Sequence, residues 1–362
     1  MIIKKKINKE ESLIYLKKVN KFLIVGKENL KLIDAYLKKS KNDFDSYLRK
    51  NFPKKFRVIK KDLQKLFKVD RKSIVNQNLK FKKPKKTHYF NFGIEGKYYS
   101  IEYNNAKIIS SVLGLLNHLQ TDAKTKSEKI HIYSSKNYCQ LKINNKNLIF
   151  KKNQSHILSG RIISYLTSNL HQIKYKSWSG FLHGTTVSKN NKGVLILGKS
   201  GSGKTLSSSI LIKNGFDLVC DDMSPLTRDG KIGFFPNALS VKPTGYKKIE
   251  ELLENDFHVC ETIGPKGPTK YIYPKNNHLK VKKIQCKKIV KISFKKNSKL
   301  KIAKIDNKDL LIHFLDDSFI NMNNISAKSF INWFLNCKCF EITYSSDNDL
   351  LKALKKMEKM WC

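Results

Sequence analysis

The sequence predicts an α/β fold built around a glycine-rich loop, on three observations between residues 192 and 222. First, the apolar run from Val194 to Leu197 is typical of a strand that is buried on both faces. Second, the residues that follow match the spacing G-x-x-x-x-G-K-[ST], which wraps phosphate groups. Third, a helical pattern from Leu206 to Leu211 ends near Gly215, a residue type that commonly terminates helices. Strand, loop and helix therefore stand in the order that a phosphate-binding loop requires.

This loop supplies the groups that a bound nucleotide needs. Its glycines permit close approach of the backbone, so that successive N–H groups can point at phosphate oxygens. Lys204 can reach the terminal phosphates, and the hydroxyl of Thr205 can bind Mg²⁺. The sequence therefore predicts a nucleotide site formed by Gly198, Lys199, Ser200, Gly201, Ser202, Gly203, Lys204 and Thr205.

Two acidic residues, Asp221 and Asp222, follow the strand-like stretch from Phe216 to Cys220. Carboxylates at the end of a strand beside a phosphate loop can hold Mg²⁺ and accept the proton of a nucleophile. Because neighbouring side chains of a strand point to opposite faces, we expect at most one carboxylate to bind the metal directly. The other can act as a general base toward a substrate hydroxyl. Which residue takes which role stays open at this point.

The composition excludes several classes of protein. Net charge is +43, but the basic residues are almost all lysines spread along the chain, whereas specific base readers favour arginine. Nucleic acid is therefore not the expected partner. No segment approaches the ~20 apolar residues of a membrane span, and the N-terminus lacks a signal-peptide pattern. The seven cysteines show no C-x-x-C pair. We expect a cytoplasmic protein with reduced thiols and no membrane partner.

At 362 residues the chain is long enough for two or three folding units. Residues 1–73 read as a small helical module, compatible with a winged-helix arrangement, and 74–87 as a basic linker. Residues 88–362 form the main domain, with a β-rich lead-in over 88–180 and the core over 181–362. In the module we expect a strand at 22–25 and helices within 30–37, 44–48 and 59–67.

Alternating and helical patterns place further elements in the main domain. In the lead-in we expect strands at 89–94, 98–103, 130–133, 139–143 and 148–151, and helices at 108–119 and 157–170. Residues 181–187 read as one strand that leads into the loop strand. Further along, the patterns predict strands at 289–294, 300–305 and 339–344, and helices at 310–319, 327–335 and 349–360.

A family resemblance rests on three consecutive motifs. These are L-H-G at Leu182 to Gly184, G-V-L-I-L-G-x-S-G-x-G-K-T ending at Thr205, and I-K-N-G-F-D-L-V-C-D-D ending at Asp222. Together they resemble the catalytic domain of the HPr kinase/phosphorylase superfamily, most closely the HPr kinase-related small kinases. These kinases share a fold with ATP-dependent phosphoenolpyruvate carboxykinase. The similarity spans about 88–360, is strongest over 181–243, and extends to Phe234-Phe235-Pro236, Leu239 to Lys242 and Gly267 to Pro274.

The resemblance implies an ATP- and Mg²⁺-dependent kinase. It gives Lys204 and Thr205 the phosphate and magnesium roles, and it gives Asp221 and Asp222 the metal and base roles. His183 would lie beside the transferred phosphate, and Lys242 and Lys270 either contact phosphate or substrate or are solvated side chains. The expected catalytic residues are therefore Asp221, Asp222, His183 and Lys204, and the expected metal ligands are Thr205, Asp221 and Asp222.

Two departures from the family pattern limit which properties of the family we expect in this chain. Leu206 stands where HPr kinases carry a glutamate after the loop hydroxyl, and their glycine-rich signature loop is not visible after residue 243. Neither HPr as the substrate nor the reverse phosphorolysis is therefore expected. The acceptor hydroxyl can belong to a small molecule, a peptide or a protein. Members of this superfamily often assemble, so a homo-oligomer is compatible with the resemblance.

A second reading belongs to a different functional class. The stretch leading into Leu32-Ile33-Asp34 resembles PqqD-like modules, which bind peptides in peptide-modifying systems. On this reading the chain is a nucleotide-dependent peptide- or partner-binding protein without phosphate transfer, and the N-terminal module binds the peptide. An unrelated helical cap explains the same stretch equally well.

Overall fold

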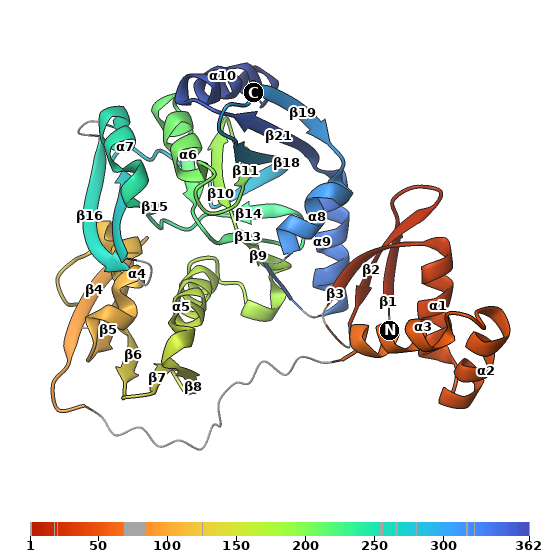
Figure 1. The fold of residues 1–362 in the computed structure, drawn as a ribbon. Coiled ribbons are helices and arrows are strands. Elements are labelled where there is room, and N and C mark those ends of the chain that lie inside the picture. The colour runs from red at the N-terminus through yellow and green to blue at the C-terminus, as the bar shows by residue number, and fades with distance from the viewer. Residues whose placement is uncertain are drawn as a thin grey trace.

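The protein, described here from a computed structural model, has a mixed α/β fold with four β-sheets (Figure 1). The structure describes residues 2–17, 19, 21–68, 84–124, 126–253, 256–264, 267–279, 281–315, 318–321 and 323–361. Among these residues no helix is long and apolar enough to cross a membrane. Most of the predicted linker, over 74–83, lies outside the described residues.

The largest sheet has ten strands and carries the glycine-rich loop. Its main path runs β12-β10-β11-β18-β14-β13-β9-β20, and β21 pairs with both β18 and β19. The central strand β11 pairs antiparallel with β10 and parallel with β18. The strands are β9 (Gly180–Leu182), β10 (Thr185–Lys189), β11 (Lys192–Leu197), β12 (Asp217–Cys220), β13 (Ser224–Leu226), β14 (Lys231–Gly233), β18 (Lys283–Phe294), β19 (Lys301–Ile305), β20 (Phe319–Ile320) and β21 (Lys338–Tyr344).

Helices cover both faces of this sheet, which explains the continuous apolar run in β11. Val194 and Ile196 pack into one core with α6 and α10, whereas Leu195 and Leu197 pack into the other with α8 and α9. A strand buried on both faces cannot alternate between apolar and polar residues. The helices are α6 (Lys204–Lys213), α8 (Asn307–Leu315), α9 (Asn324–Asn336) and α10 (Asp347–Trp361).

The lead-in forms a second sheet with two helices, as the sequence patterns predict. Its five strands follow the order β4-β5-β6-β7-β8, and their apolar face packs on α4 and α5. A three-stranded sheet, β15-β17-β16, lies between this unit and α7. The bounds are β4 (His88–Ile94), β5 (Lys97–Tyr103), α4 (Ala106–Leu116), β6 (Glu128–Ser134), β7 (Tyr138–Ile143), β8 (Lys146–Lys151), α5 (Ser155–Leu170), β15 (Leu239–Val241), α7 (Tyr246–Leu253), β16 (Phe257–Gly264) and β17 (Gly267–Pro274).

The N-terminal residues contain more β-structure than the sequence predicts. The three expected helices are present, but they follow a three-stranded antiparallel sheet of which the sequence predicts only the last strand. The elements are β1 (Ile2–Lys6), β2 (Glu11–Leu16), β3 (Lys21–Gly26), α1 (Lys27–Lys38), α2 (Lys41–Asn51) and α3 (Phe56–Leu66). In Figure 1 this part, in red, lies beside α8 and α9.

Both faces of this small sheet are buried. Ile14 and Leu16 pack against α1 to α3, while Tyr15 on the opposite face belongs to the main core. The ring of Phe22 lies 4.7 Å from that of Tyr15 and 5.2 Å from that of Phe330 in α9, measured between centroids. The N-terminal part therefore shares an apolar core with the main domain.

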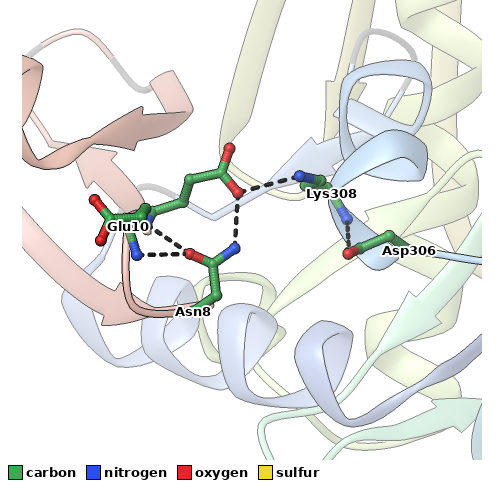
Figure 2. A network of polar contacts seen from close by, with 5 residues as sticks. Asn8, Glu10, Asp306 and Lys308 are labelled. Atoms are coloured by element: carbon green, nitrogen blue, oxygen red, sulfur yellow. Dashed lines mark hydrogen bonds and ion pairs between the residues drawn. The ribbon is translucent and has the colours of Figure 1, made fainter.

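A polar network borders this apolar contact (Figure 2). Glu11 accepts a hydrogen bond from Asn8 Nδ2 at 2.8 Å and pairs with Lys308 Nζ at 3.2 Å. The backbone N–H of Lys308 donates to Asp306 Oδ1 at 3.0 Å, at the start of α8. The turn between β1 and β2 is thereby linked to the main domain.

Two predicted elements are wrong in their extent. Residues 181–187 do not form one strand: β9 ends at Leu182, β10 begins at Thr185, and the two strands pair with different neighbours. The predicted helix over 310–319 ends at Leu315, and Phe319 belongs to the short strand β20. The break after Leu182 places His183 in a connection between strands.

Candidate functional site

The loop Gly198 to Thr205 connects β11 to α6, so the predicted strand and helix flank it. Two of its glycines are required by close contacts. A Cβ atom at Gly198 would lie 2.3 Å from Ser202 Oγ, and one at Gly203 would lie 2.0 Å from Tyr344 Oη. Gly203 also has a φ of 95°, in the left-handed region that favours glycine. The first turn of α6 begins at Lys204, so the N–H groups at the helix start face the loop.

Tyr344 holds the loop from β21, and nothing in the sequence pattern pointed to it. Its hydroxyl donates a hydrogen bond to Ser202 O at 3.0 Å, and burial raises the pKa of the phenol to about 12. The phenol therefore stays protonated and keeps donating at neutral pH. Because its strand pairs with β18, the contact ties the loop to the centre of the large sheet.

Two lysines lie at the loop, and a third predicted lysine does not. Lys204 Nζ donates to Gly198 O at 2.6 Å, and Lys242 Nζ contacts Ser200 Oγ. Lys270 instead pairs with Glu250 and, at 2.9 Å, with Glu261. Its Nζ also lies 4.7 Å from the centroid of the Tyr246 ring. The hydrogen bonds to Glu250 and Glu261 raise the pKa of the Lys270 ammonium. They hold this ammonium at the β17 surface, so Lys270 is not part of the candidate site.

Asp221 is buried directly after β12, with an exposed fraction of 3%. Thr185 Oγ1 donates to its Oδ1, and the backbone N–H of Ser240 donates to its Oδ2 at 3.2 Å. Burial, followed by the neighbouring charge of Asp222, raises the pKa of Asp221 to about 7, against the opposing effect of these donors. A cation bound at this carboxylate would favour its charged form.

Asp222 differs from Asp221 in environment and backbone conformation. Its φ of 56° turns the chain out of the strand direction, and its side chain is partly exposed. The next backbone N–H, of Met223, donates to Asp221 O at 2.5 Å, which closes this tight turn. The two carboxylates therefore have different surroundings, and both follow the end of β12 rather than lying within it.

A short segment, residues 237–240, joins the acidic pair to the loop. Asn237 Nδ2 donates to Asp221 O at 2.6 Å, and Asn237 Oδ1 accepts from Asp221 N at 3.0 Å. Ser240 O accepts the hydroxyl proton of Thr205 at 3.0 Å, while Ser240 N donates to Asp221. One peptide strand thus fixes the loop hydroxyl and the buried carboxylate relative to each other. We refer to residues 237–240 as the bridge segment.

The lead-in is attached to this bridge segment. The backbone N–H of Ala238 donates to Leu115 O, near the end of α4, at 3.0 Å. On the adjacent β17, Tyr271 packs so closely on α4 that a Cβ atom at Gly114 would lie 2.2 Å from its ring. Burial, followed by the charge of Asp222, raises the pKa of the Tyr271 phenol. The lead-in therefore reaches the site through both α4 and its contact with β17.

His183 lies in the connection between β9 and β10, two residues before Thr185. Its backbone N–H donates to Ser318 Oγ at 3.0 Å. The adjacent Gly184 O accepts a hydrogen bond from Ser224 Oγ, also at 3.0 Å. This connection thus runs beside the turn that carries Asp222 and Met223.

Sequence reasoning missed four residues that hold the site: Thr185, Asn237, Ser240 and Tyr344. Thr185 and Asn237 contact Asp221 from 36 and 16 residues away in the chain. Polar residues of this kind in strands and loops carry no spacing signal. The motif residues could be found because nucleotide chemistry restricts their types, whereas their supports depend on the fold.

Comparison with known proteins adds little to this description. No protein-family model and no curated protein matches the chain. A solved structure, the Hpr(Ser) kinase/phosphatase from Coxiella burnetii, matches with 16% sequence identity over 50% of this chain and 95% of that one. Its TM-score is 0.25, which is too low to support a conclusion about fold or function. The proposal below therefore rests on the site itself.

Proposed function

We propose that the chain is an ATP- and Mg²⁺-dependent phosphotransferase that transfers the γ-phosphate to a hydroxyl group. The observation that carries the proposal is the position of Ser240, whose backbone O accepts a hydrogen bond from Thr205 Oγ1 and whose backbone N–H donates to Asp221 Oδ2. Phosphate transfer needs a phosphate-binding loop and acidic residues that are held at fixed positions relative to each other. The bridge segment supplies that relation.

The residues of the site fit ATP and Mg²⁺. Thr205 donates its proton to Ser240 O, so the lone pairs of its hydroxyl oxygen are free to face a cation. Asp221 is the buried carboxylate that Ser240 also contacts, and we assign it as a ligand of Mg²⁺. Mg²⁺ commonly takes only one or two carboxylates together with substrate phosphates. When bound there, it neutralises charge on the β- and γ-phosphates.

Positive groups of the loop would stabilise the charge of the transferred phosphate. Lys204 already points into the loop, where its Nζ lies against Gly198 O. Lys242, directly after β15, adds a second ammonium group. The N-terminus of α6 contributes backbone N–H groups and the positive end of its dipole. Such preorganised donors act without reorganising during the reaction.

We assign the base role to Asp222. Both oxygens of Asp221 accept hydrogen bonds from the protein, whereas Asp222 is partly exposed in a turn that leaves the strand. From this position its carboxylate would accept the proton of the acceptor hydroxyl as the oxygen attacks the γ-phosphate. His183, on the neighbouring connection, would then lie on the acceptor side of the site.

A transfer assay with γ-labelled ATP tests the proposal. Wild-type protein with Mg²⁺ is incubated with serine, small alcohols, serine- and threonine-containing peptides and candidate proteins, with Lys204→Ala as the matched control. We expect labelled product that depends on both Mg²⁺ and Lys204. ATP binding without transfer to any acceptor would instead support the nucleotide-dependent peptide- or partner-binding protein. Equal transfer by Lys204→Ala would contradict the proposed site.

A further inference from the structure

Arg161 on α5 is a cation with unused hydrogen-bonding capacity. The chain has only five arginines among 72 basic residues, and this one is partly buried. Its Nη1 donates to Tyr175 Oη at 3.2 Å, and its Cζ lies 5.6 Å from the centroid of the Tyr175 ring. Within the described ranges, no carboxylate pairs with this guanidinium. A guanidinium has five N–H donors, so most of them remain available to a ligand.

Tyr175 holds that guanidinium in place because its own ring is fixed. It stacks between Phe181 and Phe319, with centroid distances of 5.8 Å to each and interplanar angles of 17° and 26°. Its backbone oxygen also accepts a hydrogen bond from Asn321 Nδ2 at 3.1 Å. The phenol oxygen therefore offers Arg161 a rigid partner, which limits the entropy lost when a ligand binds.

The same contacts place Arg161 near the acceptor side of the site. Phe181 precedes His183 by two residues, and Phe319 follows Ser318, whose hydroxyl accepts the His183 N–H. On α5, a Cβ atom at Gly160 would lie 3.7 Å from Met223 Sδ, directly after Asp222. Arg161 is thus carried by a helix that contacts Met223, the residue after Asp222, and its phenol partner packs on Phe181, two residues before His183.

We propose that Arg161, positioned by Tyr175, binds a carboxylate of the phosphate acceptor. This inference rests on the proposed phosphotransfer. A planar guanidinium matches the shape and single charge of one carboxylate, and the pair can form two parallel hydrogen bonds. The acceptor class is therefore a molecule that carries both a hydroxyl and a carboxylate. That carboxylate belongs either to a small hydroxy acid or to an acidic residue beside a serine in a peptide.

Paired acceptors that differ only in the carboxylate test the proposal. One pair is L-serine and L-serinamide, and the other is the blocked peptides Ac-Ser-Glu-NH₂ and Ac-Ser-Gln-NH₂. Their binding to full-length protein saturated with Mg²⁺ and a non-hydrolysable ATP analogue is measured by calorimetry, and transfer is measured with γ-labelled ATP. In at least one pair we expect the acid to bind about 10- to 100-fold more tightly than its amide, as is typical of hydrogen bonds to charged groups.

Variants assign that preference to the guanidinium. Arg161→Gln should abolish it by weakening binding of the acid alone, with nucleotide affinity unchanged, and Arg161→Lys should restore it in part. Tyr175→Phe should raise KM for the acid more than it lowers kcat, as expected for a positioning residue. Arg228→Gln is the matched control, because Arg228 contacts Lys176 O in the same turn, and it should keep the full preference.

The outcomes separate this inference from the proposed function. If neither pair shows a preference for the acid, or if Arg161→Gln keeps the preference, the carboxylate site is wrong even where transfer occurs. If the acid is preferred and Arg161→Gln abolishes that preference, but no labelled product forms, the carboxylate site stands and the phosphotransferase proposal fails. The pair that shows the preference identifies the source of the carboxylate.

Discussion

The glycine-rich loop and the contact between the N-terminal sheet and α9 are held in opposite ways. The loop is fixed by polar contacts to its backbone, from Tyr344 to Ser202 O, and by the contact of Thr205 with Ser240 O. The N-terminal contact depends on aromatic packing, with Phe22 between Tyr15 and Phe330. Substitutions at the first region should therefore change ligand binding, whereas substitutions at the second should change stability.

The largest effect on stability is expected from Phe330→Ala. Phe330 is fully buried in the core that the N-terminal sheet shares with the main domain. Removing such a ring typically lowers the free energy of unfolding by about 3–5 kcal/mol. Denaturant unfolding would measure the loss, and nucleotide affinity below the transition should stay unchanged. Ile325→Ala, on the same helix but 60% exposed, is the control and should have little effect. Equal effects of both variants would show that the shared core does not stabilise the chain.

At the loop, Lys204→Ala should have the largest effect on activity. Loss of one charged group that stabilises the transferred phosphate typically lowers kcat by about 10²- to 10³-fold. Because Lys204 lies at the helix start rather than in the core, the thermal midpoint should stay close to that of the wild type. Steady-state kinetics and a thermal melt together check this prediction. A large fall in the midpoint would show that Lys204 stabilises the fold, as the residues of the N-terminal contact do, rather than acting on the ligand.

Tyr344→Phe tests whether the loop depends on its distant support. The variant leaves Ser202 O without its phenol donor, and an unsatisfied buried group typically costs about 1–3 kcal/mol. We expect roughly a tenfold loss of nucleotide affinity by calorimetry, given 1.4 kcal/mol per factor of ten. Tyr89→Phe is the control, since Tyr89 is 60% exposed. Unchanged affinity would mean that the loop keeps its shape without Tyr344.

The pH dependence of Mg²⁺-nucleotide binding follows from Asp221. Its pKa of about 7 means that the carboxyl is largely protonated below that pH, and a bound cation requires the charged form. Affinity should therefore rise as pH increases, by about fivefold between pH 6 and pH 7 and about tenfold from pH 6 to the plateau above pH 8. Calorimetry in two buffers of different ionisation enthalpy would detect the released proton. A binding affinity that does not change with pH would show that Asp221 is not a ligand of the metal.

Glu11→Gln should have the smallest effect. The pair of Glu11 and Lys308 is on the surface at the border of the N-terminal contact, and exposed pairs often contribute nothing measurable. We expect an unchanged thermal midpoint at physiological salt and unchanged nucleotide affinity. A clear loss of stability would show that the polar border, and not only the aromatic core, holds the N-terminal part.

The two regions also differ in how far the sequence alone predicts them. The loop and the acidic pair could be found because phosphate and metal chemistry leave few residue types for each position. The site around them could not, because Thr185 and Asn237 reach Asp221 only after the strands are placed. The likeness to known structures is too weak to replace this reasoning, so the roles of Asp222 and His183 stay predictions.

The first two N-terminal strands, β1 and β2, were missed for a physical reason. The stretch Leu13 to Leu16 is buried throughout, because helices cover one face of the sheet and the main domain covers the other. Such a strand shows no alternation of apolar and polar residues, and the lysines of β1 resemble a solvated segment. The break at His183 was missed because residue types that favour strands lie on both sides of it, Phe181-Leu182 before and Thr185 to Val187 after.

The bridge segment has a consequence for how this protein can be studied and how it can diverge. Within this segment, Ser240 contacts Thr205 and the carboxylate of Asp221 through its main chain, so any residue at position 240 that keeps the extended backbone preserves these two contacts. Alanine scanning would report position 240 as neutral, and related sequences are free to vary there. At position 240, only a change in the main chain, such as proline with its missing N–H, would reveal the contact. A search based on side-chain identity would therefore overlook the part of the site on which its geometry depends.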